Sequence, residues 1–359
     1  MKKILFVINS LGKGGGERVV ANLAEEMSKG NEVTILTLKN EKFYSINNNI
    51  KYIVLSGKNK GNKIKRALNI RNQINQINQI IRELEKEVKF DLITVHLPYS
   101  HLLMSLSEYK DKCYYVVHTV YSKKFTKLKS LRKSMLKFIY NNKKIVSVSD
   151  GVASELKDYF KVEAKEYNVI NNPIDLEEIN KKANEYLEFN DKYLLFVGRL
   201  TKIKRVDILI KAYAEGTISE KYKLVILGEG EEKESLINIC KEEKVFDNVL
   251  FVGWESNPYK WMKNAEILVS TSEYEAFPMN LIEALGCGTK VVSVDCDYGP
   301  REILKGELER FLVKSYDIKE INKVLNEAIS VYPNKIKKVA QKYEIQTIVN
   351  RYLELCEGE

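Results

Sequence analysis

Two glutamates, Glu275 and Glu283, have the spacing that most directly suggests chemistry, with seven residues between them. An apolar, strand-like run, Ala265–Ser270, precedes them, and a helical pattern follows. Glu275 is therefore predicted in a strand-to-helix loop and Glu283 one to two turns inside the helix. A helix that starts near Pro278 directs free backbone N–H groups at the loop, which favours an anion. The segment predicts a site for a ligand with phosphates in its middle and hydroxyls at both ends.

A simpler interpretation is available for the same pair. Acidic residues favour turns and first helical turns, so Glu275 could cap a turn and Glu283 could lie on a solvated helix face. A second segment favours the ligand site. Arg199 directly follows the strand-like run Tyr193–Gly198, and Lys204 begins the next helix. Two cations at the carboxyl end of a strand suit a diphosphate, although an ordinary basic turn would have the same sequence.

Glycine-rich turns follow several of the strand-like runs. Gly228 and Gly230 follow Leu224–Leu227, where a base and ribose could be accommodated, or where a helix simply begins. The run Leu11–Arg18 contains four glycines, among them Gly15 and Gly16, which would let a ligand approach the backbone closely. A dinucleotide fingerprint is poorly matched, because position 17 is glutamate and the second strand ends without an acidic residue.

The composition indicates a soluble globular protein of two domains. The 359 residues exceed what one hydrophobic core usually supports, and 44% are apolar and 30% charged. We expect no membrane span and no signal peptide, because no long apolar run occurs. Five scattered cysteines without a C-x-x-C pair indicate neither a disulfide framework nor a zinc site, and favour a reducing, cytoplasmic compartment.

Short apolar strands alternate with helical patterns, which predicts α/β architecture with parallel sheets covered on both faces. The first series contains Lys3–Ile8, Glu32–Leu38, Asp91–Val95, Cys113–His118 and Lys144–Val148. A turn-rich hinge at 171–175 precedes the second series, which contains Tyr193–Gly198, Leu224–Leu227, Val249–Val252, Ile267–Ser270 and Lys290–Val294. We therefore expect two doubly wound, Rossmann-like domains, residues 1–172 and 173–342, facing each other across a cleft.

The order of the motifs carries a resemblance. The chain contains GGGER, GRL followed by a lysine, GEG, the segment with two glutamates, and GPRE, in that order. This order resembles the retaining glycosyltransferases of family four, which have the GT-B fold, and the resemblance covers nearly the whole chain. It departs at two positions: Ala276 replaces the usual glycine after the first motif glutamate, and Gly16 replaces an alanine.

The resemblance implies roles for individual residues. Arg199 and Lys204 would hold the donor diphosphate, Glu283 the ribose, and Glu275 the donor sugar, with His118 near that sugar as a further catalytic residue. Gly15 and Gly16 would leave room for the donor phosphates and the acceptor, and residues 343–359 would form a helix that returns to the first domain. The remaining donor-binding positions are Gly228, Phe277, Pro278, Met279, Asn280 and Leu281.

The implied activity is retaining transfer of a hexose or N-acetylhexosamine from a UDP-sugar to a hydroxyl of a lipid-linked or cell-envelope glycan. The nucleotide-sugar is a co-substrate, so no cofactor is expected. No metal is expected either. Asp295 and Asp297 are interpreted as loop-capping residues, and His96 and His101 are interpreted as packing or surface residues. Two alternatives are a nucleotide-sugar epimerase of similar fold and a basic nucleic-acid-binding protein, although no recognisable nucleic-acid module is present.

The positive charge is concentrated in one half of the chain. Residues 1–172 carry 31 basic and 16 acidic residues, a net charge of +15, whereas residues 173–359 carry 27 and 33, a net charge of −6. Between Lys112 and Ser149, apolar residues at helical spacing alternate with basic ones. This predicts either an interfacial helix at the inner face of the cell membrane or a core-facing helix with a solvated basic side. The basic residues are Lys123, Lys124, Lys127, Lys129, Arg132, Lys133 and Lys137.

Overall fold

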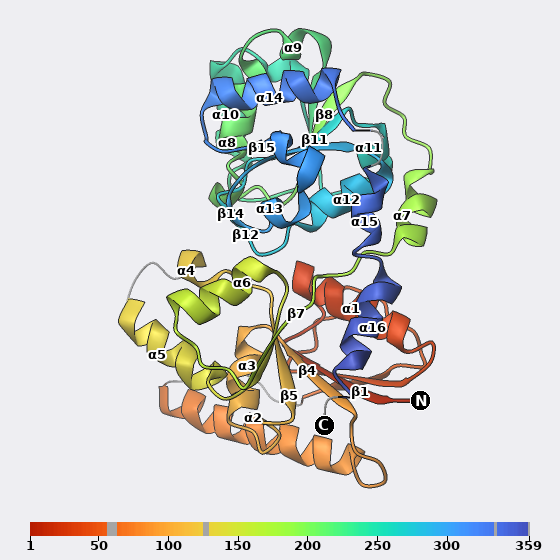
Figure 1. The fold of residues 1–359 in the computed structure, drawn as a ribbon, viewed down its shortest axis with the longest axis vertical. Helices are drawn as coiled ribbons and strands as arrows, with labels where there is room; N and C mark the ends of the chain where they lie inside the picture. Colours follow the sequence, from red (N-terminus) through yellow and green to blue (C-terminus); the bar gives the residue numbers. More distant parts are fainter. Residues whose placement is uncertain (56–62, 125–128, 334–335, 358–359) are drawn as a thin grey trace. The chain divides into compact units, whose positions relative to one another are not determined.

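The computed structural model describes residues 1–55, 63–124, 129–333 and 336–357, and within these the chain divides into two compact units. Unit 1 contains Met1–Pro173 together with Ile345–Glu359, and unit 2 contains Ile174–Glu344. Both units are α/β, as the alternation of strands and helices predicts (Figure 1). The final helix, α16 (Ile345–Glu354), belongs to unit 1, where it packs beside α1 (Gly15–Met27).

Unit 1 is built on a parallel sheet, which has seven strands within the described residues. Their spatial order is β3-β2-β1-β4-β5-β6-β7. The strands are β1 (Lys3–Ile8), β2 (Glu32–Thr37), β3 (Lys51–Val54), β4 (Leu92–His96), β5 (Cys113–Val117), β6 (Lys144–Ser147) and β7 (Glu166–Val169). The short strands β3 and β7 lie beyond those that the apolar runs predicted. The order reverses between β1 and β4, so the loops after these two strands diverge at a topological switch point.

The central strands of unit 1 are continuous apolar runs because helices cover both faces. Every residue of Ile4–Ile8 is fully buried. The helices between the strands are α1, α2 (Lys63–Leu84), α3 (Pro98–Ser105), α4 (Tyr121–Lys124), α5 (Lys129–Tyr140), α6 (Asp150–Ser154) and the single π-helical turn η1 (Glu155–Tyr159).

Unit 2 repeats the architecture with a parallel sheet of six described strands, in the order β10-β9-β8-β11-β13-β15. They are β8 (Tyr193–Val197), β9 (Lys223–Leu227), β10 (Val249–Gly253), β11 (Ile267–Ser270), β13 (Lys290–Val294) and β15 (Leu312–Val313). The switch point lies between β8 and β11, which pair through Ile267 opposite Leu194. Ligands of open α/β sheets bind beyond the carboxyl ends of the strands at such a point, so these two strands locate the candidate site.

The helices of unit 2 cover both faces of this sheet. Its α-helices are α7 (Leu176–Ala183), α8 (Val206–Ala214), α9 (Ile218–Lys221), α10 (Lys233–Glu242), α11 (Pro258–Asn264), α12 (Met279–Cys287), α13 (Pro300–Ile303), α14 (Ile318–Ser330) and α15 (Lys337–Gln341). Its 3-10 turns are η2 (Lys202–Lys204), η3 (Phe246–Asn248) and η4 (Gly306–Phe311).

A small parallel pair, β12 (Tyr274–Glu275) and β14 (Asp297–Tyr298), joins two loops at the carboxyl edge of unit 2. Glu275 pairs with Tyr298, which places the turn at Gly299 against the loop that carries Glu275. A Cβ on Gly299 would lie 2.4 Å from Pro278 Cδ and 3.2 Å from the Glu275 carbonyl oxygen. Glycine is therefore required there by close approach, and the GPRE motif supports the first motif glutamate.

Candidate active site

The structure brings Lys204 and Glu275 into direct contact. Lys204 Nζ donates to Glu275 Oε1 at 2.5 Å, and Ser272 Oγ donates to the same oxygen at 2.7 Å. The two side chains of the ion pair are only 25% and 14% exposed. Glu275 therefore contacts a cation from a loop distant in sequence, which a turn-capping role alone does not explain.

Further hydrogen bonds tie the two loops of the switch point together. Thr271 Oγ1 donates to the carbonyl oxygens of Lys204 and Arg205 at 3.1 and 2.9 Å, and Glu273 N donates to Ile203 O at 2.7 Å. Tyr316 Oη, from the loop before α14, donates to Ser272 O at 2.9 Å. The loops after β8 and β11 are thus held at fixed separation, although about 70 residues lie between them in the sequence.

Arg199 and Glu283, two further residues that are predicted to bind the donor, differ in how exposed their side chains are. Arg199 is exposed, as a side chain that meets a soluble anion must be. Glu283 is buried in α12 with 4% of its surface exposed, so the expectation of a solvated helix face is wrong. A buried carboxylate is costly unless it is hydrogen-bonded, which makes this position suitable for a polar function.

The start of α12 is fixed by its own side chains. Asn280 Nδ2 donates to the carbonyl oxygen of Val197 at the end of β8, at 3.0 Å. Phe277 is buried and packs edge-to-face on Tyr343, with ring centroids 5.3 Å apart. The side chains of Phe277 and Asn280 therefore serve the fold, and these positions can serve a ligand chiefly through their backbone. The N–H of Leu281 already donates to Pro278 O at 3.2 Å.

Glycines at the ends of β8, β9 and β10 allow the backbones to touch. Gly228 N donates to Gly253 O at 2.7 Å, and a Cβ on Gly228 would lie 1.9 Å from Gly198 O. Gly228 also has a φ of +143°, which favours glycine. Trp254, which the sequence analysis did not consider, directly follows Gly253 and is 58% exposed.

In unit 1 the end of β4, the loop after β5 and the start of α1 bring His96, His118 and Gly16 together. His96 Nδ1 lies 3.0 Å from His118 Nε2, and His96 Nε2 lies 3.0 Å from Thr94 Oγ1. A Cβ on Gly16 would lie 3.1 Å from Leu97 Cδ2 and 3.6 Å from His118 Cγ, so the backbone of α1 runs closely past the imidazole. His96 thus contacts His118 directly, a pairing that the sequence alone did not predict.

Burial keeps these histidines neutral. Burial removes water from His118 and lowers its pKa to about 4. A hydrogen bond with the side chain of Asn172 raises this pKa by a smaller amount. The pKa of His96 is lowered well below its usual value by burial and then by His118. The buried His101 has a pKa of about 3 for the same main reason, and its Nδ1 lies 2.7 Å from the hydroxyl of Tyr140. Of the two predicted roles for His96 and His101, packing or surface, the structure shows burial and therefore packing.

The glycine-rich turn before α1 is partly filled by its own acidic residue. A Cβ on Gly14 would lie 2.0 Å from Glu17 Oε2, so the carboxylate folds back over the helix start. A negative side chain at a helix N-terminus is electrostatically favourable there and competes with a phosphate. No described atom lies near the Cβ that Gly15 lacks, which leaves space beside it.

One departure from the family pattern, Ala276, is compatible with the backbone. Ala276 does not adopt a positive φ, so this position does not require glycine.

Asp295, the first residue of the D-x-D sequence, accepts a hydrogen bond from Arg301 Nε at 2.9 Å. This ion pair joins the loop after β13 to α13, and the loop-capping interpretation of Asp295 and Asp297 stays a prediction.

The basic helical segment is described in part. Lys127 lies outside the described residues, as do Phe125 and Leu128, and the side chains of Lys124 and Lys129 are likewise not described. On α5, Leu136 and Ile139 face the core, whereas Leu131, Met135 and Phe138 are 65%, 41% and 60% exposed. Exposed apolar residues at helical spacing therefore accompany Arg132, Lys133 and Lys137. Within the described residues, no helix has the length and apolarity that crossing a bilayer requires.

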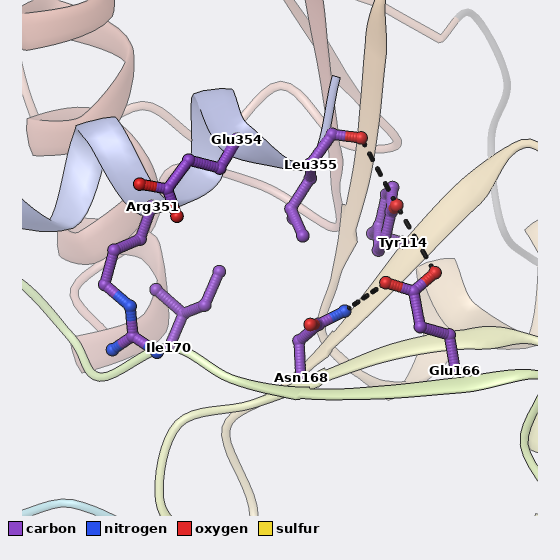
Figure 2. Close-up of a pocket in the computed structure, with 7 residues that line it drawn as sticks. All are labelled: Tyr114, Glu166, Asn168, Ile170, Arg351, Glu354 and Leu355. Carbon is purple, nitrogen blue, oxygen red and sulfur yellow. Dashed lines mark hydrogen bonds between the residues drawn. The ribbon is translucent and has the colours of Figure 1, made fainter. Parts of the chain in front are cut away.

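A pocket in unit 1 lies where α16 meets β5 and β7 (Figure 2). Its polar groups anchor the helix: Arg351 Nη2 donates to Val169 O at 2.5 Å, and Tyr114 Oη donates to Leu355 O at 3.3 Å. Glu166 accepts from Asn168 Nδ2 at 2.7 Å. These contacts fix the last helix on unit 1.

Comparison with known proteins gives this arrangement a family. Residues 13–178 match the family described as Glycosyltransferase Family 4, and residues 177–345 match Glycosyl transferases group 1. The N-acetylgalactosamine-N,N'-diacetylbacillosaminyl-diphospho-undecaprenol 4-alpha-N-acetylgalactosaminyltransferase of Campylobacter jejuni is 31% identical over 309 residues, which cover 84% of this chain and 83% of the relative. The lipopolysaccharide 1,6-galactosyltransferase of Escherichia coli is 28% identical over 191 residues, 52% of each chain.

A solved structure agrees in fold over the full length. HepE of Anabaena, in complex with UDP and glucose, superposes with a TM-score of 0.80 at 17% identity, covering 100% of both chains. Two parallel sheets in two units, with each switch point at the carboxyl ends of the strands, are the features of the GT-B fold. The chain therefore belongs to the group 1 glycosyltransferases of family four and has the GT-B fold.

Proposed function

We propose that this glycosyltransferase moves a hexose or N-acetylhexosamine from a UDP-sugar to a hydroxyl group of a lipid-linked or cell-envelope glycan, with retained configuration. The observation that carries the proposal is the cluster of Lys204, Glu275 and Ser272 at the switch point of unit 2. The names of the relatives support the acceptor class, since one acts on a diphospho-undecaprenol-linked sugar and another on lipopolysaccharide. The UDP bound to HepE supports the donor class.

The donor would lie along the carboxyl edge of unit 2. Its nucleoside would rest on the glycine contacts at Gly228, beside the exposed Trp254, with the ribose hydroxyls bound by Glu283. Arg199 and the backbone at the start of α12 would bind the diphosphate. Lys204 would exchange its contact with Glu275 for a phosphate oxygen, which leaves the Glu275 carboxylate for the hydroxyls of the sugar.

In the proposed reaction the bond between the anomeric carbon and the diphosphate oxygen breaks, and its electron pair leaves with UDP. The acceptor oxygen bonds to the same face of the anomeric carbon, and its proton passes to the leaving diphosphate. Negative charge therefore develops on the diphosphate, where Lys204 and Arg199 would stabilise it electrostatically without a metal or cofactor.

Product analysis tests this function. The full-length protein is incubated with UDP-glucose, UDP-galactose or a UDP-N-acetylhexosamine, with and without a bacterial lipid-linked glycan fraction, and with EDTA in one arm. We expect transfer that requires acceptor, retains the α-configuration of the donor and persists in EDTA. Conversion of free UDP-sugar without acceptor would instead identify an epimerase. Activity that vanished with EDTA and returned with Mn²⁺ would contradict the metal-free mechanism.

We further propose that α5 places the enzyme at the inner face of the cell membrane. Leu131 and Phe138 are exposed apolar residues on a helix that also carries Arg132, Lys133 and Lys137, and an anionic surface would receive both kinds of side chain. A lipid-linked acceptor would be presented at the same surface.

The double variant Leu131→Ser/Phe138→Ser is therefore expected to lose binding to vesicles that contain anionic lipid. The wild type should sediment with such vesicles, should bind neutral vesicles weakly, and should be released by salt, because surface charges are screened within about 10 Å at 0.1 M salt. Val331→Ser, which removes an equally exposed apolar side chain from unit 2, is the matched control. Equal binding of the wild type to neutral and anionic vesicles would contradict the proposal.

A further inference from the structure

The loop after β2 is built onto the glycine-rich turn of unit 1. Leu11 N donates to Glu41 O at 2.9 Å, and Phe43 N donates to Leu11 O at 2.8 Å, so Leu11 and Lys42 form a parallel bridge. Tyr44 Oη donates to the Gly14 carbonyl oxygen at 3.3 Å. Because its backbone is bonded in this way, the loop presents its side chains in fixed positions at the carboxyl edge of the sheet.

The side chains of this loop form an aromatic platform. Phe43 is 42% exposed although its ring packs edge-to-face on Tyr44, with centroids 5.2 Å apart. The ammonium group of Lys13 lies over the Phe43 ring, 4.8 Å from its centroid. The carboxylate of Glu41 lies beside Gly12, 3.9 Å from the position of the missing Cβ. One exposed ring, one exposed cation and one carboxylate therefore border the turn that leads to Gly15 and Gly16.

These groups are complementary to a sugar that carries a phosphate. The C–H faces of a pyranose pack on an aromatic ring, a carboxylate accepts hydrogen bonds from sugar hydroxyls, and an ammonium group binds phosphate. The contact between Lys13 and Phe43 is exposed and weak, so the ammonium group can move to a phosphate and leave the ring face to the sugar.

We propose that Phe43, Lys13 and Glu41 form a subsite for the phosphate-linked sugar of the acceptor. The subsite rests on the proposed function in one respect, namely that the acceptor is a glycan attached through phosphate. It adds residues to which the resemblance gave no role, and it assigns the acceptor's sugar to the Phe43 ring and its phosphate to Lys13.

Binding of glucose 1-phosphate tests the subsite, with glucose and inorganic phosphate as separate arms. Saturating UDP is present so that the donor site is occupied, and ligand saturation-transfer NMR gives the dissociation constants. We expect glucose 1-phosphate to bind the wild type more tightly than either fragment. Phe43→Ala should weaken it about tenfold, and Phe43→Tyr should restore binding, since the platform requires a ring. Lys13→Gln should remove the advantage of the phosphorylated sugar over glucose.

The chain supplies a matched control. Phe246 in unit 2 is 43% exposed and has Lys241 over its ring at 5.5 Å, so Phe246→Ala removes the same chemistry from another surface. Binding of glucose 1-phosphate that is absent in the wild type, unchanged by Phe43→Ala, or equally weakened by Phe246→Ala would overturn the subsite. The binding of UDP, measured by thermal shift in the same variants, should not change. Failure of the wild type to bind UDP would instead count against the proposed function.

Discussion

Replacing Lys204 with alanine is expected to lower kcat by about 30- to 1000-fold, which corresponds to about 2–4 kcal/mol of transition-state stabilisation. The ammonium group lies in a partly buried site 2.5 Å from Glu275, so it is already positioned where the donor would bind. In the proposed reaction it stabilises charge that grows on the leaving diphosphate. We therefore expect the loss in kcat to exceed the loss in affinity for UDP-sugar.

Lys202 provides the control for this variant. It lies two residues away on the same 3-10 turn, and its side chain is exposed. Lys202→Ala removes the same charge from the same surface and should leave turnover within about twofold, because exposed charges are screened by solvent. Turnover of Lys204→Ala within a fewfold of the wild type would show that the diphosphate is stabilised elsewhere. Thermal unfolding of both variants separates catalysis from stability, since Glu275 keeps its hydrogen bond from Ser272.

The parts of the fold that the sequence predicts are those set by local patterns. Buried parallel strands are continuous apolar runs, so β1, β8 and β11 can be located from composition alone. The strands β3, β7 and β15 are short and lie at or near sheet edges, where the apolar signal is weak. Once the strands are known, the switch points follow from the order of the chain in each sheet, and so does the edge that carries the loops with Arg199 and Glu275.

The contacts within the site are harder to predict, because they join segments that are distant in sequence. The burial of Glu283 follows from how α12 packs, so the same residue type at the same helical position could equally have been solvated. His96 shows no motif of its own, and its contact with His118 depends on the pairing of β4 with β5. The position of the Phe43 loop also cannot be predicted from the local sequence, because it depends on the bridge between Leu11 and Lys42.

Unit 1 is expected to lose stability as the pH falls from about 6.5 to 5, whereas unit 2 should not. The chain contains three histidines, His96, His101 and His118, and all lie in unit 1. Burial lowers the pKa of each in the folded state, so in this range the unfolded chain binds protons that the folded chain does not. The free energy of unfolding then falls with decreasing pH, by as much as about 1.4 kcal/mol per pH unit for each fully buried histidine.

At pH 5 His96 and His101 would together remove about 4 kcal/mol, and His118, with a pKa of about 4, would remove about 2 kcal/mol more. Domains are typically stable by only 5–15 kcal/mol, so unit 1 should unfold separately from unit 2 in urea near pH 5.

Urea unfolding at pH 7, 6 and 5, followed by hydrogen exchange in each unit, measures the effect. Carboxylates do not explain a change above pH 5, because they protonate at lower pH. If the midpoint of unit 1 stayed constant from pH 7 to 5, the folded chain would have to bind as many protons as the unfolded chain, and the three histidines would then not be held neutral by burial.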